Sequence, residues 1–216
     1  MSPAISVVLF DLDDTLTDAA QFGATVLADA AKRYGYDLEI DAIRAYPGVR
    51  YEPQLVQQFH IDPSEAAAIY QAYVRLYNGM MRGALQPQPG ASELLHALAA
   101  RDVRMGLVTN KVEALARDVL AMFGWESLIG TIAGQDSYTF RKPDPRIALE
   151  ALTILDGRPE AAAFVGDTES DMECARGAQI ATVIGMLSTT PGERLTEAGA
   201  THLCTSLDEV LAIVMG

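Results

Sequence analysis

The sequence contains few of the groups that would suit an oxidising compartment or a membrane. Cysteine occurs only twice in 216 residues, at Cys174 and Cys204, and neither a disulfide framework nor a zinc-ligand spacing is present. No apolar run approaches ~18 residues, which is about the length of a transmembrane helix. The first ten residues lack the cationic start of a targeting segment. We therefore expect a cytoplasmic protein that has no membrane partner.

Positive charge is also scarce. Lysine and arginine together number 16 against 29 aspartates and glutamates, which gives a formal net charge of −13. Such a surface repels a phosphate backbone, so we do not expect a nucleic-acid partner. An acidic protein can still handle a small anionic substrate where a bound cation reverses the local field.

The apolar segments of the chain alternate between strand-like and helix-like patterns. From about residue 91 onward, short β-branched runs are separated by stretches with helical periodicity. This alternation predicts βαβ units and an α/β fold: a Rossmann-like, doubly wound parallel sheet. The predicted strands cover residues 5–10, 103–108, 128–133, 161–165 and 180–184.

Residues 18–85 interrupt the alternation. They contain no strand-like run, their apolar residues repeat at helical spacing, and they hold seven of the eight tyrosines. We predict an inserted helical domain over 18–85 and a discontinuous Rossmann-like core over 1–17 and 86–216. The proline-rich segment 86–90 is the expected return hinge.

Polar residues follow the predicted strands at the points where catalytic groups would be placed. Ligands of such sheets bind at the carboxyl ends of the strands, which meet at one edge. We therefore expect one cluster to form from Asp11, Asp13, Thr109, Asn110, Lys142, Asp167 and Asp171.

Two of these groups also resemble helix starts. Asn110 with Glu113, and Ser170 with Glu173, have the spacing of an N-cap pair. Each motif has a structural interpretation when taken alone, because aspartates after strands are often turns or caps. The order of the four motifs and their placement after successive strands favour catalysis instead.

The expected chemistry follows from the residue types. Clustered carboxylates repel one another, and Mg²⁺ with oxygen ligands resolves that conflict. Lys142 and the helix start at Asn110 can hold phosphate oxygens. A carboxylate can itself accept a phosphoryl group, and Asp13 is then placed for general acid and base catalysis.

The four motifs resemble those of the haloacid dehalogenase-like hydrolases. The segments that match are 11–16, Thr109-Asn110, Lys142-Pro143 and 166–171, and the helical insert is similar to the type 1 cap of that family. The later motifs resemble the phosphoglycolate phosphatase-like branch in particular. One departure is Asp14, where many relatives have glycine.

This resemblance implies a role for each residue. Asp11 would be the nucleophile that forms an aspartyl-phosphate, and Asp13 would protonate the leaving alcohol and then deprotonate water. Thr109, the Asn110 backbone and Lys142 would bind the phosphoryl group. Mg²⁺ would be held by Asp11, the backbone carbonyl of Asp13, Asp167 and Asp171.

The resemblance implies a phosphatase that acts on a small phosphorylated metabolite, such as a phosphoglycolate-like compound or a sugar phosphate. The presence of Asp13 argues against dehalogenation, whose halide leaving group needs no proton. A β-phosphoglucomutase-like isomerase and a non-catalytic binding protein remain alternatives. The chain is expected to be a monomer or a homodimer. Within the insert, Arg44 and Arg50 flank a loop that could contact substrate.

Overall fold

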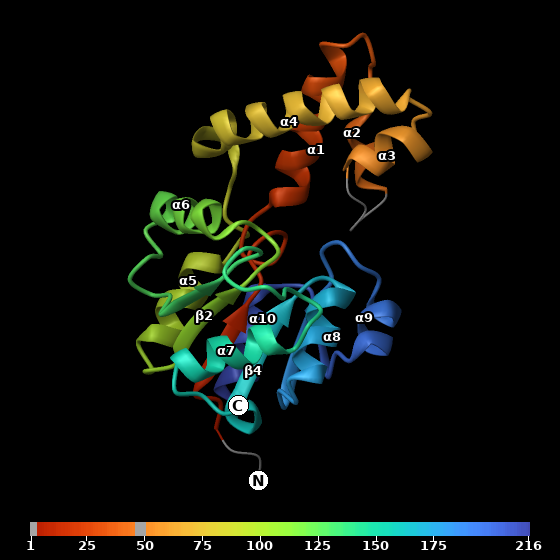
Figure 1. The fold of residues 1–216 in the computed structure, drawn as a ribbon. Coiled ribbons are helices and arrows are strands. Elements are labelled where there is room, and N and C mark those ends of the chain that lie inside the picture. Colours follow the sequence, from red (N-terminus) through yellow and green to blue (C-terminus); the bar gives the residue numbers. More distant parts are fainter. Residues whose placement is uncertain (1–3, 46–50) are drawn as a thin grey trace. The chain divides into compact units, whose positions relative to one another are not determined.

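The computed structural model describes residues 4–45 and 51–216. The chain folds into two compact units, shown as a ribbon in Figure 1. The first unit joins Met1–Thr17 to Pro87–Gly216, and the second is Asp18–Gln86. Tyr46, Pro47, Gly48 and Arg50, which belong to the loop considered for substrate contact, lie outside the described residues.

A six-stranded sheet forms the centre of the first unit. Its strand order is β3-β2-β1-β4-β5-β6, and every pairing is parallel. The predicted fold class, an α/β Rossmann-like sheet, is confirmed. The strands are β1 (Val7–Phe10), β2 (Arg104–Val108), β3 (Thr131–Ala133), β4 (Ala162–Gly166), β5 (Thr182–Met186) and β6 (His202–Cys204).

Helices cover both faces of the sheet, as right-handed crossovers require. On one face, buried residues of α7, α8 and α9 form a core cluster with Val7, Leu9 and Phe164. On the other face, α5 contacts β2 and α10, and α10 contacts β6. The helices of this unit are α5 (Ala91–Ala99), α6 (Glu113–Phe123), α7 (Arg146–Ile154), α8 (Glu169–Gly177), α9 (Gly192–Ala198) and α10 (Leu207–Met215), with a 3₁₀ turn η1 (Pro159–Ala161) before β4.

The strand order reverses between β1 and β4. The chain runs outward from β1 through β2 to β3, returns to β4 on the other side of β1, and continues to β6. Phe10 of β1 lies beside Leu107 of β2 and Val165 of β4. Residues that directly follow these three strands therefore lie next to one another, at the switch point where such sheets bind ligands.

Among the described residues of the second unit, helices joined by turns and loops are the regular secondary structure. Its buried core includes Leu27, Ile43, Leu55 and Ile69, one from each helix. The helices are α1 (Ala19–Lys32), α2 (Ile40–Arg44), α3 (Tyr51–Gln57) and α4 (Pro63–Ala84).

Aromatic rings line one stripe of α4. Tyr70, Tyr73 and Tyr77 recur at helical spacing, and the centroids of consecutive rings lie 5.8 and 5.6 Å apart. Tyr51 of α3 meets Tyr73 edge-on, and Phe22 of α1 meets Tyr77. Tyrosines of the insert therefore pack its helices together.

The structure contains one strand that the sequence did not predict, and β3 and β5 begin later than the predicted ranges 128–133 and 180–184. Residues 202–204, which we did not predict as a strand, form β6 at the edge of the sheet. This strand has three residues, and only Cys204 among them is buried, so it lacks the apolar run that marks the central strands. Among the described residues, no helix combines the length and the apolar character needed to cross a bilayer.

Candidate active site

A tight turn follows β1 and carries the first two aspartates. The Asp11 amide donates to the Val165 carbonyl of β4 at 2.8 Å, which extends the sheet by one residue. The Thr17 amide and hydroxyl both donate to the Leu12 carbonyl, at 3.1 and 3.2 Å. Leu12 and Leu16 are fully buried. Apolar anchors thus fix the turn, and the polar side chains between them stay at the sheet edge.

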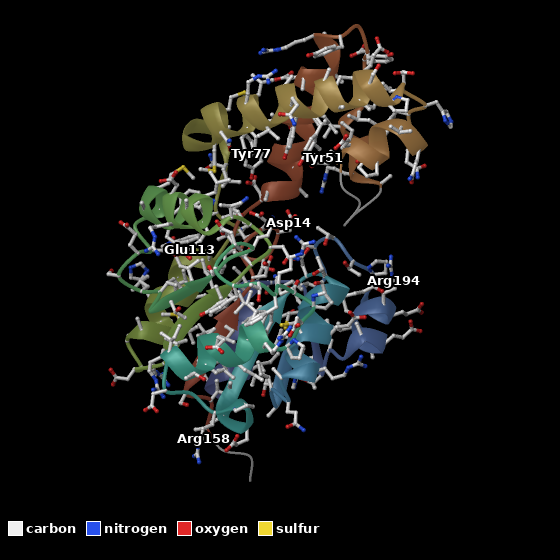
Figure 2. The ribbon with its side chains drawn as sticks, in the orientation of Figure 1. Asp14, Tyr51, Tyr77, Glu113, Arg158 and Arg194 are labelled. Atoms are coloured by element: carbon white, nitrogen blue, oxygen red, sulfur yellow. The ribbon has the colours of Figure 1, made fainter. Side chains whose placement is uncertain are left out.

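Asp14 lies in the middle of this turn, and Figure 2 labels it. Its φ of 63° is left-handed, and its amide donates to the Thr17 carbonyl at 2.8 Å. Glycine adopts this conformation without strain, and aspartate is among the few other residues that tolerate it. The backbone therefore accommodates aspartate at this position.

Three carboxylates gather at the switch point. Each of Asp11, Asp167 and Asp171 offers an oxygen within 4.8 Å of the others. Their exposed fractions are 6%, 1% and 0%. Asp11 comes from the turn after β1, Asp167 directly follows β4, and Asp171 lies in the first turn of α8. The sequence-predicted residues of two separate motifs thus lie together in a buried cluster.

Lys142 is part of the same cluster. Its ammonium donates to Asp11 Oδ1 at 2.5 Å and also to Asp171 Oδ1, and its side chain is 3% exposed. Burial alone would lower the pKa of Lys142, but the two carboxylates beside it raise that pKa above its ordinary value. The lysine therefore stays charged and offsets part of the negative charge around it.

Burial, and then the remaining negative charge, shift the pKa values of the carboxylates. Burial is the main cause that raises the pKa of Asp11 to about 7, and Asp171 and Asp13 raise it further while Lys142 opposes the shift. The pKa of Asp167 is also raised, by burial and then by Asp11 and Asp171. Thr15 donates to Asp167 Oδ1 at 3.2 Å, and Thr189 donates to its Oδ2.

Asp171 is oriented by the start of α8. Thr168 is the N-cap, and its side chain accepts from the Asp171 amide. Asp171 Oδ2 in turn accepts from the Thr168 amide at 3.0 Å and from its hydroxyl, which completes a capping box. The expected pair of Ser170 and Glu173 was wrong, because α8 begins at Glu169 and both residues lie inside it.

The residues after β2 occupy different environments. Thr109 is 1% exposed, and its amide donates to the Ala133 carbonyl of β3 at 2.9 Å, whereas the Asn110 side chain is exposed. The Lys111 amide donates to Thr109 Oγ1 at 3.2 Å. The Lys111 ammonium lies 2.8 Å from Asp13 Oδ2, so it links the turn after β1 to the loop after β2.

The expected capping of α6 by Asn110 was also wrong. The N-cap position is Val112, which has no side chain that can accept a hydrogen bond. The Glu113 amide donates instead to Asp136 Oδ1 at 2.8 Å, from the loop after β3. A residue distant in sequence supplies the cap, so local spacing could not identify it.

Three residues near the site were missed by sequence reasoning. Lys111 directly follows a predicted site residue, and its charge was the available signal. Thr15 lies within the first motif and could have been considered with it. Thr189 follows β5 in a segment without any recognisable pattern, so nothing in the sequence marked it.

The donor set fits a hard divalent cation. Three carboxylates and one ammonium leave a net charge of −2 when all are ionised, and oxygen atoms are the ligands that Mg²⁺ prefers. The Asp13 side chain lies outside this group of three, and its Oδ2 pairs with Lys111 instead. The buried cluster could therefore hold a divalent metal.

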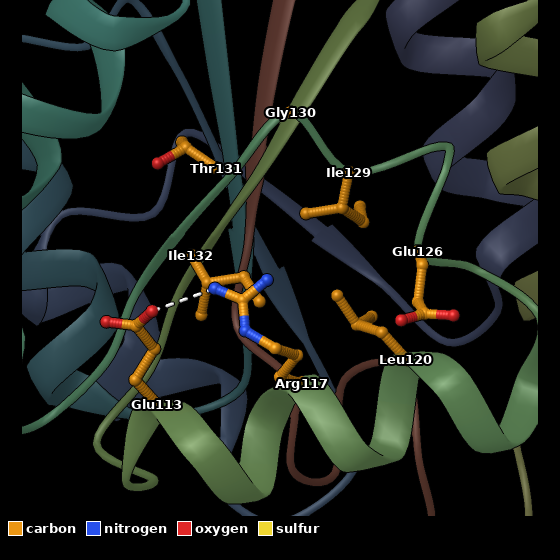
Figure 3. A pocket seen from close by; sticks show the side chains of 8 residues that line it. All are labelled: Glu113, Arg117, Leu120, Glu126, Ile129, Gly130, Thr131 and Ile132. Atoms are coloured by element: carbon orange, nitrogen blue, oxygen red, sulfur yellow. Dashed lines mark hydrogen bonds and ion pairs between the residues drawn. The ribbon is translucent and has the colours of Figure 1, made fainter.

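A hollow of about 230 Å³ lies elsewhere on the same unit, between α6 and the edge of the sheet. Figure 3 shows it from close by, with the ion pair of Glu113 and Arg117 at its rim. It contains none of the predicted site residues. The geometry of the carboxylates, and not this hollow, therefore identifies the candidate active site.

The fold and the cluster define an α/β protein with buried acidic groups at a switch point, and comparison with known proteins gives the family. Residues 8–184 match the haloacid dehalogenase-like hydrolase family, and the chain belongs to it. A phosphoglycolate phosphatase of Aquifex aeolicus is 31% identical over 185 residues, covering 83% of this chain and 84% of that protein. The corresponding enzyme of Xylella fastidiosa strain 9a5c is 30% identical over 181 residues, covering 83% and 79%.

A solved structure supports the same fold over the whole chain. The putative phosphatase of Clostridium difficile superposes with a TM-score of 0.87 at 19% identity, covering 98% of this chain and 99% of that one. The family match and the two phosphoglycolate phosphatases of about 30% identity make the chain a phosphoric monoester hydrolase of the phosphoglycolate phosphatase-like branch.

Proposed function

We propose that this protein is a Mg²⁺-dependent phosphatase that hydrolyses a small phosphomonoester through an aspartyl-phosphate on Asp11. The observation that carries the proposal is the buried cluster in which Lys142 bridges Asp11 and Asp171 beside Asp167. Such a cluster costs stability unless it binds something positive. Its position at the switch point between β1 and β4 supports a ligand-binding role.

In the proposed first step, a carboxylate oxygen of Asp11 attacks phosphorus and the bond to the leaving oxygen breaks. Asp13 gives its proton to that oxygen, so a neutral alcohol departs. In the second step water attacks phosphorus, Asp13 takes a proton from it, and the bond from Asp11 to phosphorus breaks. Phosphate leaves, and both aspartates return to their initial states.

Three groups are proposed to hold the phosphoryl oxygens. An ammonium has three N–H donors, and Lys142 uses two of them on Asp11 and Asp171, so the third can reach a phosphoryl oxygen. Thr109 Oγ1 accepts from the Lys111 amide, which directs its own O–H outward as a donor. The third donor is the backbone amide of Asn110. The Asn110 side chain is exposed, so we assign the contact to the main chain.

The metal would be held by Asp11, Asp167 and the backbone carbonyl of Asp13, with Asp171 at or just behind it. When bound, Mg²⁺ neutralises charge that develops on the phosphoryl oxygens. Asp171 has both oxygens engaged, one by Lys142 and one by Thr168, so it orients its neighbours while it contributes charge.

We propose that residues 18–85 act as a cap that excludes water and selects the substrate. The insert leaves the core at Thr17 and returns at Pro87, and these two residues form a β-bridge. Thr17 also bridges to Asp13. Both connections of the insert are therefore attached to the turn that carries the proposed acid, which supports a role in catalysis.

The experiment is turnover of a panel of phosphomonoesters with Mg²⁺, in which Asp11→Asn serves as the inactive control. The panel includes 2-phosphoglycolate and several sugar phosphates. Hydrolysis by the wild type alone supports the proposal. Turnover of a sugar phosphate that requires a bisphosphate and releases no phosphate would show an isomerase instead. Absence of any turnover would indicate a binding protein.

A further inference from the structure

Lys111 has no assigned role in the proposed reaction, yet it makes the ion pair with the proposed acid. Its ammonium lies 2.8 Å from Asp13 Oδ2, and its side chain is only 8% exposed although it belongs to a loop. Lysine keeps a long side chain out of water only where a partner compensates the loss of hydration. Here that partner is the carboxylate of Asp13.

The two oxygens of Asp13 differ in their surroundings. Oδ2 is held by Lys111, whereas Oδ1 is buried and has no hydrogen-bond partner among the residues that the structure describes. A buried acceptor without a donor costs free energy, so such atoms are uncommon unless something else binds there. Oδ1 is therefore the oxygen that is available to the substrate or to water.

The main chain of Lys111 is fixed from two sides. Its amide donates to Thr109 Oγ1 at 3.2 Å, and its carbonyl accepts from the Gln135 amide at 2.9 Å. The Lys111 side chain therefore begins from a defined position beside the proposed phosphate-binding hydroxyl. It reaches from there to the carboxylate that must meet the leaving oxygen.

We propose that Lys111 is a positioning residue for Asp13: it binds Oδ2 and thereby directs Oδ1 toward the oxygen of the leaving group. This inference rests on the proposed function. Lys142 cannot take this role, because its ammonium is held between Asp11 and Asp171. The two lysines thus have separate roles: Lys142 lies beside the proposed nucleophile Asp11, and Lys111 lies beside the proposed acid Asp13.

The test compares two aryl phosphates of similar size whose leaving groups depend to different degrees on protonation by a general acid. Phenyl phosphate has a poorer leaving group than p-nitrophenyl phosphate and depends more on protonation. Because kcat/KM reports the step in which the alcohol departs, the ratio of the two values measures how well the acid is aligned. Positioned general acids are worth about 10²–10⁴ in rate, so we expect Lys111→Met to lower kcat/KM about tenfold for phenyl phosphate and about twofold for p-nitrophenyl phosphate.

Matched variants isolate the role of the pair. Lys111→Arg should restore most of the ratio, because it keeps a cation that can bind Oδ2. Lys111→Gln, which keeps a hydrogen-bond donor but no charge, serves if the methionine variant folds poorly. Arg117→Met removes an exposed positive charge from α6 and should leave the ratio unchanged.

The decisive measurement repeats Lys111→Met in an Asp13→Asn background. If Lys111 acts through Asp13, adding Lys111→Met to Asp13→Asn should change the ratio of the two kcat/KM values by less than about twofold. An equal loss for both esters, or a full additional loss in the Asp13→Asn background, would overturn the inference. A raised KM for 2-phosphoglycolate alone would also overturn it, because Lys111 would then bind the substrate's carboxylate.

The two proposals fail in different ways. If the wild type hydrolyses neither aryl ester nor any member of the phosphomonoester panel, the proposed function is wrong and the role of Lys111 falls with it. If the wild type is active but the ratio is the same in Lys111→Met, only the positioning role is wrong.

Discussion

Replacing Lys142 by methionine removes the one ammonium that lies between Asp11 and Asp171. The wild-type side chain is 3% exposed and lies 2.5 Å from Asp11 Oδ1. Removing one partner of a buried ion pair costs about 3–5 kcal/mol, because the other charge is left without compensation. For a chain of this size about 1 kcal/mol corresponds to about 2–4 °C, so Lys142→Met should lower the Tm of the metal-free protein by about 10 °C at pH 8.

The deficit should depend on pH with a definite sign. The pKa of Asp11 in the folded protein is raised to about 7, from about 4 in an unfolded chain. Between these values the folded state binds the extra proton, so this group makes the protein less stable as the pH rises from about 4 through about 7. Loss of Lys142 should raise the pKa of Asp11 further. The variant should therefore lose more stability at pH 8 than at pH 5.5.

Thermal unfolding of the metal-free protein at these two pH values provides the assay. Lys32→Met is the matched control, since Lys32 is exposed at the end of α1. A second variant, Lys142→Met with Asp171→Asn, removes one charge of each sign and should recover part of the loss. An equal Tm for Lys142→Met and Lys32→Met at pH 8, or a larger deficit at pH 5.5, would refute the reasoning.

Three further predictions concern the same cluster. Chelation should abolish turnover and Mg²⁺ should restore it, whereas Ca²⁺ should support it poorly because its larger shell tolerates bidentate carboxylates; residual activity after exhaustive metal removal would contradict this. Asp11→Asn should form no phosphoenzyme, while Asp13→Asn should slow turnover about 10²–10⁴-fold and accumulate phosphoenzyme, as rapid-quench trapping with labelled substrate would measure. Gly166→Ala should cost about 1–3 kcal/mol and weaken Mg²⁺ binding in calorimetry, because its Cβ would lie 2.5 Å from Asp171 Cγ. Gly79→Ala in α4, where a Cβ meets nothing within 4 Å, is the control and should not destabilise the protein.

The sequence predicted the sheet well where strands are buried on both faces. All four residues of β1 and all five of β4 are buried, and an apolar run is then the only possible pattern. β6 could not be predicted in this way, because His202 and Leu203 are exposed at the edge. The polar residues that follow the strands were also predicted to meet, because the carboxyl ends of neighbouring parallel strands lie side by side.

Details that depend on side chains from distant segments could not be predicted. Asp136 caps α6 from the loop after β3, which is the next strand after that helix in the chain. Thr189 donates to Asp167 from the loop that follows β5. The sequence showed Lys111 beside a predicted motif, but not that its ammonium turns toward Asp13. These three contacts depend on the tertiary structure, because only the fold brings the partner residues within hydrogen-bonding distance.

The charge of the site explains how an acidic chain can act on an anionic substrate. When all of these groups are ionised, Lys111 balances Asp13 and Lys142 balances one of the three remaining carboxylates, so the buried cluster then has a net charge of −2. A phosphomonoester could not approach such a cluster without help, since like charges in a site of low polarity repel strongly. A divalent cation brings the cluster to neutrality, and the third N–H of Lys142 can then serve the substrate. Metal binding should therefore precede productive substrate binding, and the apparent KM should fall as Mg²⁺ saturates the site.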